Sequence, residues 1–294
     1  MRNLSFLWLE ITGRCQLQCT HCYAESGPGG TDGAMAPGDW TSVIEQAAGL
    51  GVEMVQFIGG EPTLNRSLPD YVRQARGLGM KVEVFSNLVH VSPDLWSLFE
   101  RRGVQLATSY YSDSAAEHEK ITMGRGSHQR TRANIAEAVR RSIPLRVGVV
   151  DISDGQRVSQ ARDELASLGF VGEVRVDRLR GVGRGGTAAP DPSQLCGGCG
   201  QGKAAVAPDG SVWPCVFSRW LPVGNVLTAP LAEILTGPRM RQTTATLVKQ
   251  FASGPSFPCV PKMCDPQCGP SCSPACNPAG NCTPSGKCVP TEYE

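Results

Sequence analysis

The sequence has almost no excess charge of either sign: its 294 residues include 28 basic and 27 acidic side chains. The net charge of +1 gives no electrostatic reason to expect a nucleic acid or an anionic membrane as a partner. Long apolar runs are also lacking, because none approaches the roughly 18–20 residues of a membrane-spanning helix. The short apolar segment near the N-terminus is interrupted by Glu10, so no signal peptide is readable. We therefore expect a globular, cytoplasmic protein with neither nucleic acid nor membrane as a partner.

Cysteine, by contrast, is abundant, with 13 residues in unevenly placed groups. In a reducing compartment cysteines usually bind metals or do chemistry instead of forming disulfides. The first group is Cys15, Cys19 and Cys22, the second is Cys196, Cys199 and Cys215, and seven more lie between Cys259 and Cys288. This distribution is the main clue to function.

Strand-like and helix-like segments alternate through residues 1–180. The pattern predicts strands over residues 4–11, 52–59, 81–86, 104–111, 145–152 and 173–179. It predicts helices over residues 39–50, 68–79, 93–103, 127–142 and 156–169, the first with Asp39 as N-cap. Six strand–helix repeats imply an α/β fold with parallel strands and right-handed crossovers. Six is short of the eight of a full barrel, which favours a partial barrel or a doubly wound sheet.

The composition of the sequence changes near Arg180. A Gly/Pro-rich linker is followed by a predicted hairpin that turns at Asp209-Gly210, and then by a helical segment over residues 229–253 interrupted at Gly237-Pro238. The segment from Pro255 to the end contains nine prolines and seven cysteines but no periodic apolar pattern. We expect two domains, residues 1–185 and residues 186–294, the second a small Cys-rich extension that bound clusters would order.

The first cysteine group has the spacing Cys-x3-Cys-x2-Cys directly after the first predicted strand. In a parallel α/β fold such a loop lies at the C-terminal edge of the sheet, where active sites form. Three thiolates can hold three irons of a [4Fe–4S] cluster and leave the fourth iron open. A zinc site with His21 as fourth ligand is the alternative.

This loop resembles that of the radical S-adenosylmethionine (SAM) superfamily, and later stretches agree with the family in order and position. The resemblance implies a partial (β/α)6 TIM-like barrel and places the SAM contacts at Gly59, Gly60, Glu61, Pro62, Ser86, Asn87 and Ser109, with Arg125 as a candidate for the SAM carboxylate. Tyr111 stands where the family usually has an acidic residue for the ribose. The segment that follows resembles the peptide-modifying branch at His118, Gly126, Ser127, Arg130 and Thr131.

The resemblance implies a mechanism as well as a fold. The amino and carboxylate groups of SAM chelate the open iron, and Glu61 pairs with the ammonium through a charge-assisted hydrogen bond. An electron from the reduced cluster, supplied by a flavodoxin- or ferredoxin-type reductant, cleaves SAM. The 5′-deoxyadenosyl radical that results removes a hydrogen atom from the substrate.

The second cysteine group resembles the start of the SPASM or twitch extension of radical SAM enzymes, in which thiolates at the ends of a hairpin bind an auxiliary cluster. Cys196 and Cys199 precede Gly210 and Cys215 with the spacing of that extension; a zinc ribbon is the alternative. The tail departs from the usual spacing, so we expect one or two auxiliary [4Fe–4S] clusters, with tail ligands among Cys264, Cys268, Cys272, Cys276 and Cys282.

Residues 178–186 offer a Gly-x-Gly-x-Gly pattern after the sixth predicted strand, but neither a helix nor a ribose-binding acid accompanies it. We reject a dinucleotide site on that ground. We expect Arg178, Arg180 and Arg184 to be solvated near the mouth of the barrel, where they could meet an acidic peptide.

Three functions remain open. The resemblance favours an enzyme that matures a ribosomally made precursor peptide, by a C–C or C–S crosslink or by epimerisation. Since the chain starts at the first strand, we expect a separate leader-recognition protein or direct leader binding. The alternatives are a small-molecule radical SAM dehydrogenase and, less consistent with the Gly59–Pro62 motif, a non-enzymatic iron–sulfur electron carrier.

Overall fold

The computed structural model describes residues 4–172 and 174–253. The predicted tail ligands Cys264, Cys268, Cys272, Cys276 and Cys282 lie outside the described residues. Within the described part of the chain, no helix is long and apolar enough to cross a membrane.

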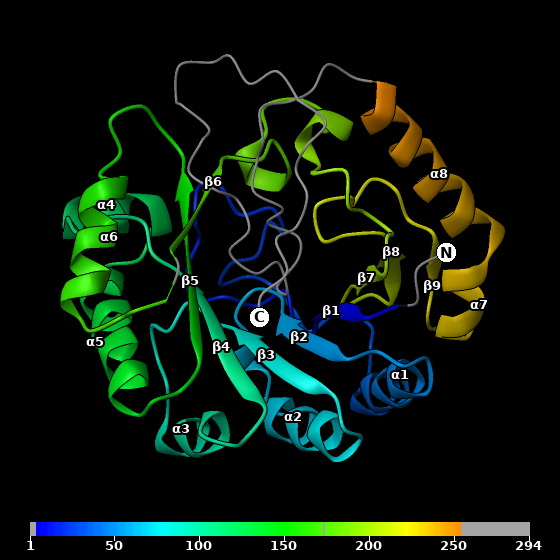
Figure 1. Cartoon of the computed structure of the whole chain (residues 1–294), viewed down its shortest axis with the longest axis horizontal. Coiled ribbons are helices and arrows are strands. Elements are labelled where there is room, and N and C mark those ends of the chain that lie inside the picture. The colour runs from blue at the N-terminus through cyan, green and yellow to red at the C-terminus, as the bar shows by residue number, and fades with distance from the viewer. Residues whose placement is uncertain (1–3, 173, 254–294) are drawn as a thin grey trace, which may run out of the picture.

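In the described residues, one curved sheet of nine strands forms the frame (Figure 1). Its order is β6-β5-β4-β3-β2-β1-β7-β8-β9, and β1 to β7 run parallel while β8 and β9 are antiparallel to their neighbours. The strands are β1 (Phe6–Glu10), β2 (Met54–Ile58), β3 (Lys81–Phe85), β4 (Val104–Ser109), β5 (Leu145–Asp151), β6 (Val174–Arg178), β7 (Lys203–Val206), β8 (Ser211–Trp213) and β9 (Gly224–Asn225). All six strands predicted for the first part of the chain are therefore confirmed, and so is the partial barrel.

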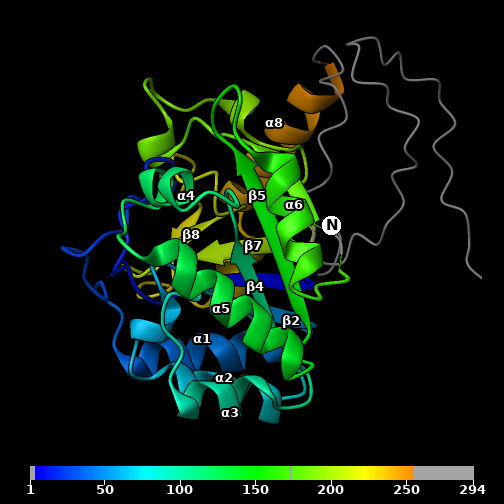
Figure 2. The ribbon, with the colours of Figure 1, turned by 90° about the vertical axis from the view of Figure 1, so that its left-hand side faces the viewer.

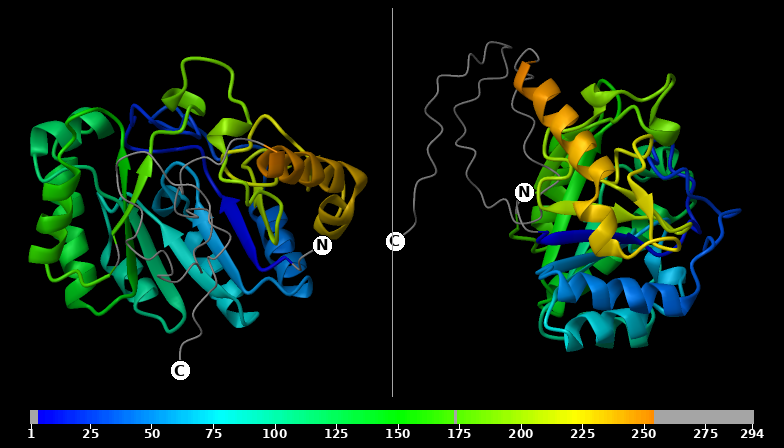
Figure 3. Two further views of the ribbon diagram at one scale, coloured as in Figure 1. Left: turned by 45° about the horizontal axis from the view of Figure 1, so that its top comes forward. Right: turned by 90° about the vertical axis from the view of Figure 1, so that its right-hand side faces the viewer.

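Helices cover the outer side of this sheet (Figures 2 and 3). They are α1 (Pro37–Gly49), α2 (Leu68–Gly77), α3 (Pro93–Phe99), α4 (Ala115–Thr122), α5 (Ser127–Arg140), α6 (Val158–Ser167), α7 (Leu231–Thr236) and α8 (Pro238–Ser253). Short 3-10 turns follow β2 and β6: η1 (Pro62–Leu64), η2 (Gly183–Gly185) and η3 (Pro192–Gln194). The helices α7 and α8 reproduce the predicted interruption at Gly237-Pro238.

Several element boundaries differ from the sequence prediction by a few residues, and one helix was not predicted. The helix α1 begins at Pro37, so Asp39 is its third residue and not its N-cap; the Asp39 carboxylate accepts a hydrogen bond of 2.8 Å from the Ala36 backbone N–H. The helix α4 was not predicted; it has only eight residues and no N-cap side-chain hydrogen bond, and its C-cap, Met123, is in left-handed conformation.

Alternation along β1 separates two apolar clusters. Leu7 and Leu9 face the helices and belong to the main core. Phe6 and Trp8 face the inside of the curve and pack in a second cluster that includes Cys199 and Cys215.

The predicted hairpin of the C-terminal extension is confirmed, and it also joins the barrel sheet. Its first strand, β7, pairs in parallel with β1, with Phe6 opposite Lys203 and Leu9 opposite Val206. The second cysteine group thus lies beside the strand that leads into the first.

Candidate functional site

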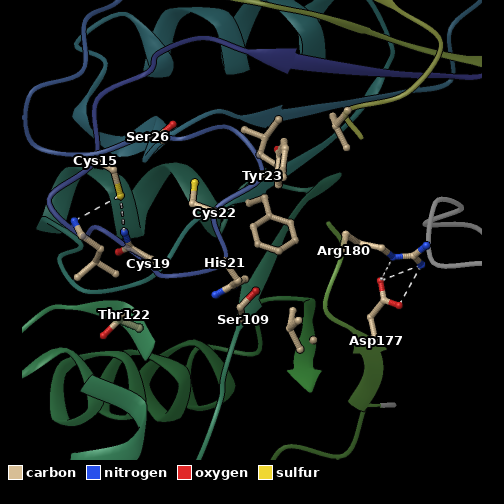
Figure 4. A pocket seen from close by; sticks show the side chains of 18 of the residues that line it. Cys15, Cys19, His21, Cys22, Tyr23, Ser26, Ser109, Thr122, Asp177 and Arg180 are labelled. Carbon is tan, nitrogen blue, oxygen red and sulfur yellow. Dashed lines mark hydrogen bonds and ion pairs between the residues drawn. The ribbon is translucent and has the colours of Figure 1, made fainter. Parts of the chain in front are cut away.

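A pocket lies inside the curve of the sheet, at the C-terminal ends of the parallel strands (Figure 4). The loop after β1 contributes Cys15, Cys19 and Cys22, all three of which line the pocket as the sequence predicts. Opposite this loop stands Ser109 at the end of β4, and residues from β5, β6 and the hairpin complete the wall. The topology therefore brings the first cysteine group together with four of the predicted SAM contacts: Gly59, Gly60, Asn87 and Ser109.

The environment of the cysteine loop suits thiolate ligands of an iron–sulfur cluster. The Leu17 backbone N–H donates to Cys15 Sγ at 3.4 Å, and Asn87 Nδ2 lies 3.6 Å from the same sulfur. Burial raises the pKa of the Cys15 thiol to about 11 and that of Cys19 to about 12. The raised pKa values mean that the thiolates form only when a cation lies nearby, and the N–H donors are placed to stabilise the sulfurs once they are charged. Both properties fit a site that binds metal.

The Gly-Gly-Glu-Pro motif, Gly59–Pro62, follows β2, and its two glycines reach this pocket. Gly59 has φ +143°, and a Cβ there would lie 2.3 Å from the Thr12 carbonyl oxygen, so glycine is required for β2 to approach the loop after β1 this closely. Gly59 and Gly60 line the pocket with their backbone.

Glu61 lies beneath the pocket, fully buried. Its Oε1 accepts hydrogen bonds from the Thr63 backbone N–H at 3.1 Å and from Thr63 Oγ1 at 2.7 Å. Its Oε2 accepts from the Asn87 backbone N–H at 2.7 Å. The carboxylate thus ties the end of β2 to the end of β3. Glu61 is not among the residues that line the pocket, and its pairing with the SAM ammonium stays a prediction.

Three other predicted contacts also lie off the pocket wall. Pro62 and Ser86 are buried behind it, and Ser86 Oγ accepts a hydrogen bond of 3.0 Å from the Leu88 N–H. Arg125 is exposed, and its carbonyl oxygen accepts a hydrogen bond of 2.7 Å from Arg130 Nη2. The motif resemblance placed Arg125 near a helix start, but a sequence does not show which way a side chain points.

The ribose-contact region contains a histidine–tyrosine pair. Tyr111 Oη lies 3.2 Å from His21 Nε2, and both residues line the pocket. Burial, with a further contribution from Arg184, lowers the pKa of His21 to about 4. The imidazole is therefore neutral at physiological pH. A tyrosine hydroxyl stands where the family usually has an acid.

Of the three arginines expected to be solvated, Arg178 is exposed, whereas Arg184 is half-buried and Arg180 is buried. Arg180 is buried and pairs with Asp177, Nη2 to Oδ1 at 3.0 Å (Figure 4). Arg146, which sequence reasoning missed, lines the pocket and pairs with the fully buried Glu83, Nη2 to Oε1 at 2.8 Å. An arginine on an inward-facing position of β5 is the signal that could have identified it.

The second cysteine group lies next to the pocket, in the inner apolar cluster. Cys199 and Cys215 are buried, and Cys196 packs at the edge of the same cluster. The Phe217 N–H donates to Cys215 Sγ at 3.5 Å, which repeats the N–H···S arrangement of Cys15. Phe217 and Val216 line the pocket, so the hairpin forms part of its wall.

Comparison with known proteins identifies both regions. Residues 9–159, just over half of the chain, match the radical SAM superfamily, and residues 196–277 match the SPASM iron–sulfur cluster-binding domain. A PqqA peptide cyclase from Streptomyces rochei is 29% identical over 269 residues, covering 77% of this chain and 74% of the relative. A PqqA peptide cyclase from Xanthomonas campestris is 32% identical over 145 residues, 48% of this chain but only 38% of the relative.

Solved structures agree on the fold. SuiB of Streptococcus suis, bound to its precursor peptide SuiA, superposes with a TM-score of 0.67 at 12% identity, over 82% of this chain and 66% of that chain. The anSMEcpe structure with bound AdoMet gives a TM-score of 0.64 at 14% identity, over 81% and 82% of the two chains. Together with the sequence matches, these findings show that the chain belongs to the radical SAM superfamily of enzymes, whose barrel domain binds SAM and a [4Fe–4S] cluster and whose SPASM domain binds auxiliary iron–sulfur clusters.

Proposed function

We propose that this enzyme modifies a peptide made by the ribosome, by crosslinking or epimerising residues after hydrogen abstraction in the pocket. The observation that supports the proposal most is continuity: one pocket is lined by the three thiols of the first cysteine loop and by Val216 and Phe217 of the cysteine hairpin. The relative from Streptomyces rochei, a PqqA peptide cyclase, matches this chain across most of its length. A cytoplasmic location is part of the proposal.

In this proposal the chain's own groups have distinct tasks. Cys15, Cys19 and Cys22 hold the SAM-binding cluster, and Gly59, Gly60, Asn87 and Ser109 contact SAM from the pocket wall. When bound, cluster and SAM together supply the radical that abstracts a substrate hydrogen. The inner apolar cluster around Phe6 and Trp8 excludes water from this space, which protects a reactive radical from side reactions.

The hairpin thiols Cys196, Cys199 and Cys215 would hold the first auxiliary cluster, together with a thiol of the tail. Cys264, Cys268, Cys272, Cys276 and Cys282 stay predictions as ligands, and so does a flavodoxin- or ferredoxin-type reductant. A leader-recognition partner also stays a prediction.

The experiment that tests the peptide proposal is co-expression with short open reading frames encoded beside the gene, followed by mass spectrometry of the peptides. A loss of two hydrogens indicates a crosslink or an oxidation. An unchanged mass with one deuterium gained in heavy water indicates epimerisation. The Cys19→Ala variant is the matched control and should leave every peptide unmodified.

A small-molecule substrate is the second candidate. The structure of BtrN in complex with AdoMet and 2-DOIA superposes with a TM-score of 0.54 at 17% identity, over 85% of this chain. A S-adenosylmethionine-dependent nucleotide dehydratase from a Thermoplasmatales archaeon is 28% identical over 173 residues. Peptides that remain unmodified by an enzyme that cleaves SAM would favour this candidate over the first.

A further inference from the structure

The glycine-rich segment after β6 forms a turn that packs directly on the first cysteine loop. In η2, Gly183 has φ +57°, and a Cβ there would lie 2.4 Å from the Tyr23 carbonyl oxygen and 2.6 Å from that of Cys22. Only glycine allows this approach. The Arg184 backbone N–H then donates to the Cys22 carbonyl oxygen at 3.0 Å. The pattern rejected as a dinucleotide motif is therefore a contact between the linker and the cluster loop.

The Arg184 side chain extends this contact along the loop. Its Nε donates to the Cys19 carbonyl oxygen at 2.8 Å, and its Nη2 donates to the Ser26 carbonyl oxygen at 2.6 Å. These two acceptors lie on either side of Cys22 in the sequence. One planar guanidinium, with donors in fixed directions, thus spans the segment that presents two of the three thiols.

The charge of Arg184 is also distinct among the pocket arginines. Arg146 is neutralised by Glu83, and Arg180 by Asp177. Within the described ranges, the hydrogen bonds of the half-buried Arg184 side chain go to carbonyl oxygens. Arg178 also donates to a carbonyl oxygen, but it is exposed at the rim, where solvent screens its charge.

The same linker also contacts the segment that leads into the second cysteine group. Arg180 Nη1 donates to the Gln194 carbonyl oxygen at 3.0 Å, and the Gly181 N–H donates to Gln194 Oε1 at 2.7 Å. Gln194 ends η3, two residues before Cys196. The segment from Arg180 to Gln194 therefore touches the entry to the hairpin with one part and the SAM-cluster loop with another.

We propose that Arg184 is a positioning residue for the SAM-binding cluster: its guanidinium fixes the loop between Cys19 and Ser26, and its positive charge raises the reduction potential of the cluster. A cation held near an anionic cluster favours the reduced form, which carries one more negative charge. The inference rests on the cluster of the superfamily and not on a peptide substrate, so its test needs no substrate.

The test compares Arg184→Gln, Arg184→Lys and the surface control Arg73→Gln, all in the reconstituted full-length protein. Arg73 is half exposed on α2 and pairs with Asp70. Redox titration followed by electron paramagnetic resonance reports the potential of each cluster, and the signal that changes when SAM is added marks the SAM-binding one. Iron content and the rate of 5′-deoxyadenosine formation with dithionite are measured alongside.

We expect Arg184→Gln to lower the potential of the SAM-sensitive signal and to slow SAM cleavage about tenfold or more, within the 10–100-fold typical of supporting residues around metal sites. Arg184→Lys should have the reduction potential of the wild type but only part of its cleavage rate. An ammonium group keeps the positive charge but lacks the planar set of donors with which the guanidinium binds two carbonyl oxygens. Arg73→Gln should match the wild type in both.

An Arg184→Gln potential equal to that of Arg73→Gln, with an unchanged SAM-induced spectrum, would overturn the proposal. If the Arg184→Gln variant does not retain its iron, the Arg184→Lys variant is compared with the wild type instead. A reduction potential of Arg184→Lys below that of the wild type would contradict the electrostatic role. Failure of the wild type to modify any peptide would count against the proposed substrate class and leave these readouts intact.

Discussion

The ring of Tyr23 meets the ring of Phe217 edge to face, with 5.0 Å between the ring centroids. Tyr23 directly follows Cys22, and Phe217 lies two residues after Cys215, to whose sulfur its N–H donates. The loops of the two cysteine groups, almost 200 residues apart in the chain, therefore touch through this aromatic pair. The pair closes one side of the pocket and makes the position of each loop depend on the other.

Replacing this pair should reveal its coupling. Tyr23→Leu and Phe217→Leu should each lower the free energy of unfolding of the reconstituted protein. The loss in the double variant should be smaller than the sum of the two single losses, by about 0.5–1.5 kcal/mol, the usual value for an aromatic pair beyond its buried area. Tyr23→Leu combined with Phe99→Leu, a buried residue of α3, is the control and should be additive. Additivity in both pairs would contradict the coupling.

Glu61→Gln should lower the free energy of unfolding by about 1–3 kcal/mol. The NH2 group of the new amide would replace one carboxylate oxygen and would face a backbone N–H or hydroxyl group that donates to that oxygen in the wild type. SAM binding should weaken together with stability, since Asn87 is held by the same carboxylate. Urea unfolding and SAM titration measure the two effects. Weaker SAM binding with unchanged stability would instead support a direct contact between Glu61 and the SAM ammonium.

Asn87 and Arg125 should behave differently, although the sequence suggested both as SAM contacts. Asn87 lines the pocket and reaches Cys15 Sγ, so Asn87→Ala should reduce SAM cleavage by about 10–100-fold. Arg125 is exposed off the pocket wall, so Arg125→Gln should leave the affinity for SAM within about twofold of the wild type, below the ~1 kcal/mol of an ordinary hydrogen bond. A loss of SAM affinity in Arg125→Gln as large as that in Asn87→Ala would show that the Arg125 side chain reaches SAM.

Glu83→Gln should be among the most destabilising changes on the inner face of the sheet. The buried carboxylate of Glu83 accepts hydrogen bonds from Gln56, from Gln105 Nε2 at 2.8 Å and from Arg146. Losing it leaves the Arg146 charge without a partner, at a cost of about 2–4 kcal/mol, less than for a fully buried pair because Arg146 is partly exposed. The double variant Glu83→Leu/Arg146→Met should recover part of this loss in urea unfolding. No recovery would contradict the assignment of the cost to an unpaired charge.

The six strands of the first part of the chain and the place of the first cysteine group were predictable, because both follow from local patterns. Buried runs such as Met54–Ile58 specify strands, and parallel pairing brings their carboxyl ends to one edge. The pairing of β7 with β1 was not predictable from local patterns, since strand neighbours across almost 200 residues depend on the whole core. It is this pairing that brings the hairpin thiols to the pocket.

The roles of charged residues were the least predictable part of the site. Arg180 and Asp177 are three residues apart, but their burial as a pair depends on the path of the linker. Glu61 matched a motif correctly, yet only the structure shows that its oxygens are taken by Thr63 and Asn87. A motif identifies which residue type stands at a position, whereas the direction in which the side chain points depends on packing.

We propose that the thiols of Cys15, Cys19 and Cys22 hold the iron–sulfur cluster at which SAM is cleaved. The most direct test is to reconstitute the full-length protein with iron and sulfide, reduce it with dithionite and measure 5′-deoxyadenosine formed from SAM. We predict steady formation at about eight to twelve irons per chain, for the SAM-binding cluster and one or two auxiliary clusters of about four irons each, and none in Cys19→Ala, whose iron content should fall by about four. Iron-loaded wild-type protein that leaves SAM intact would contradict the account.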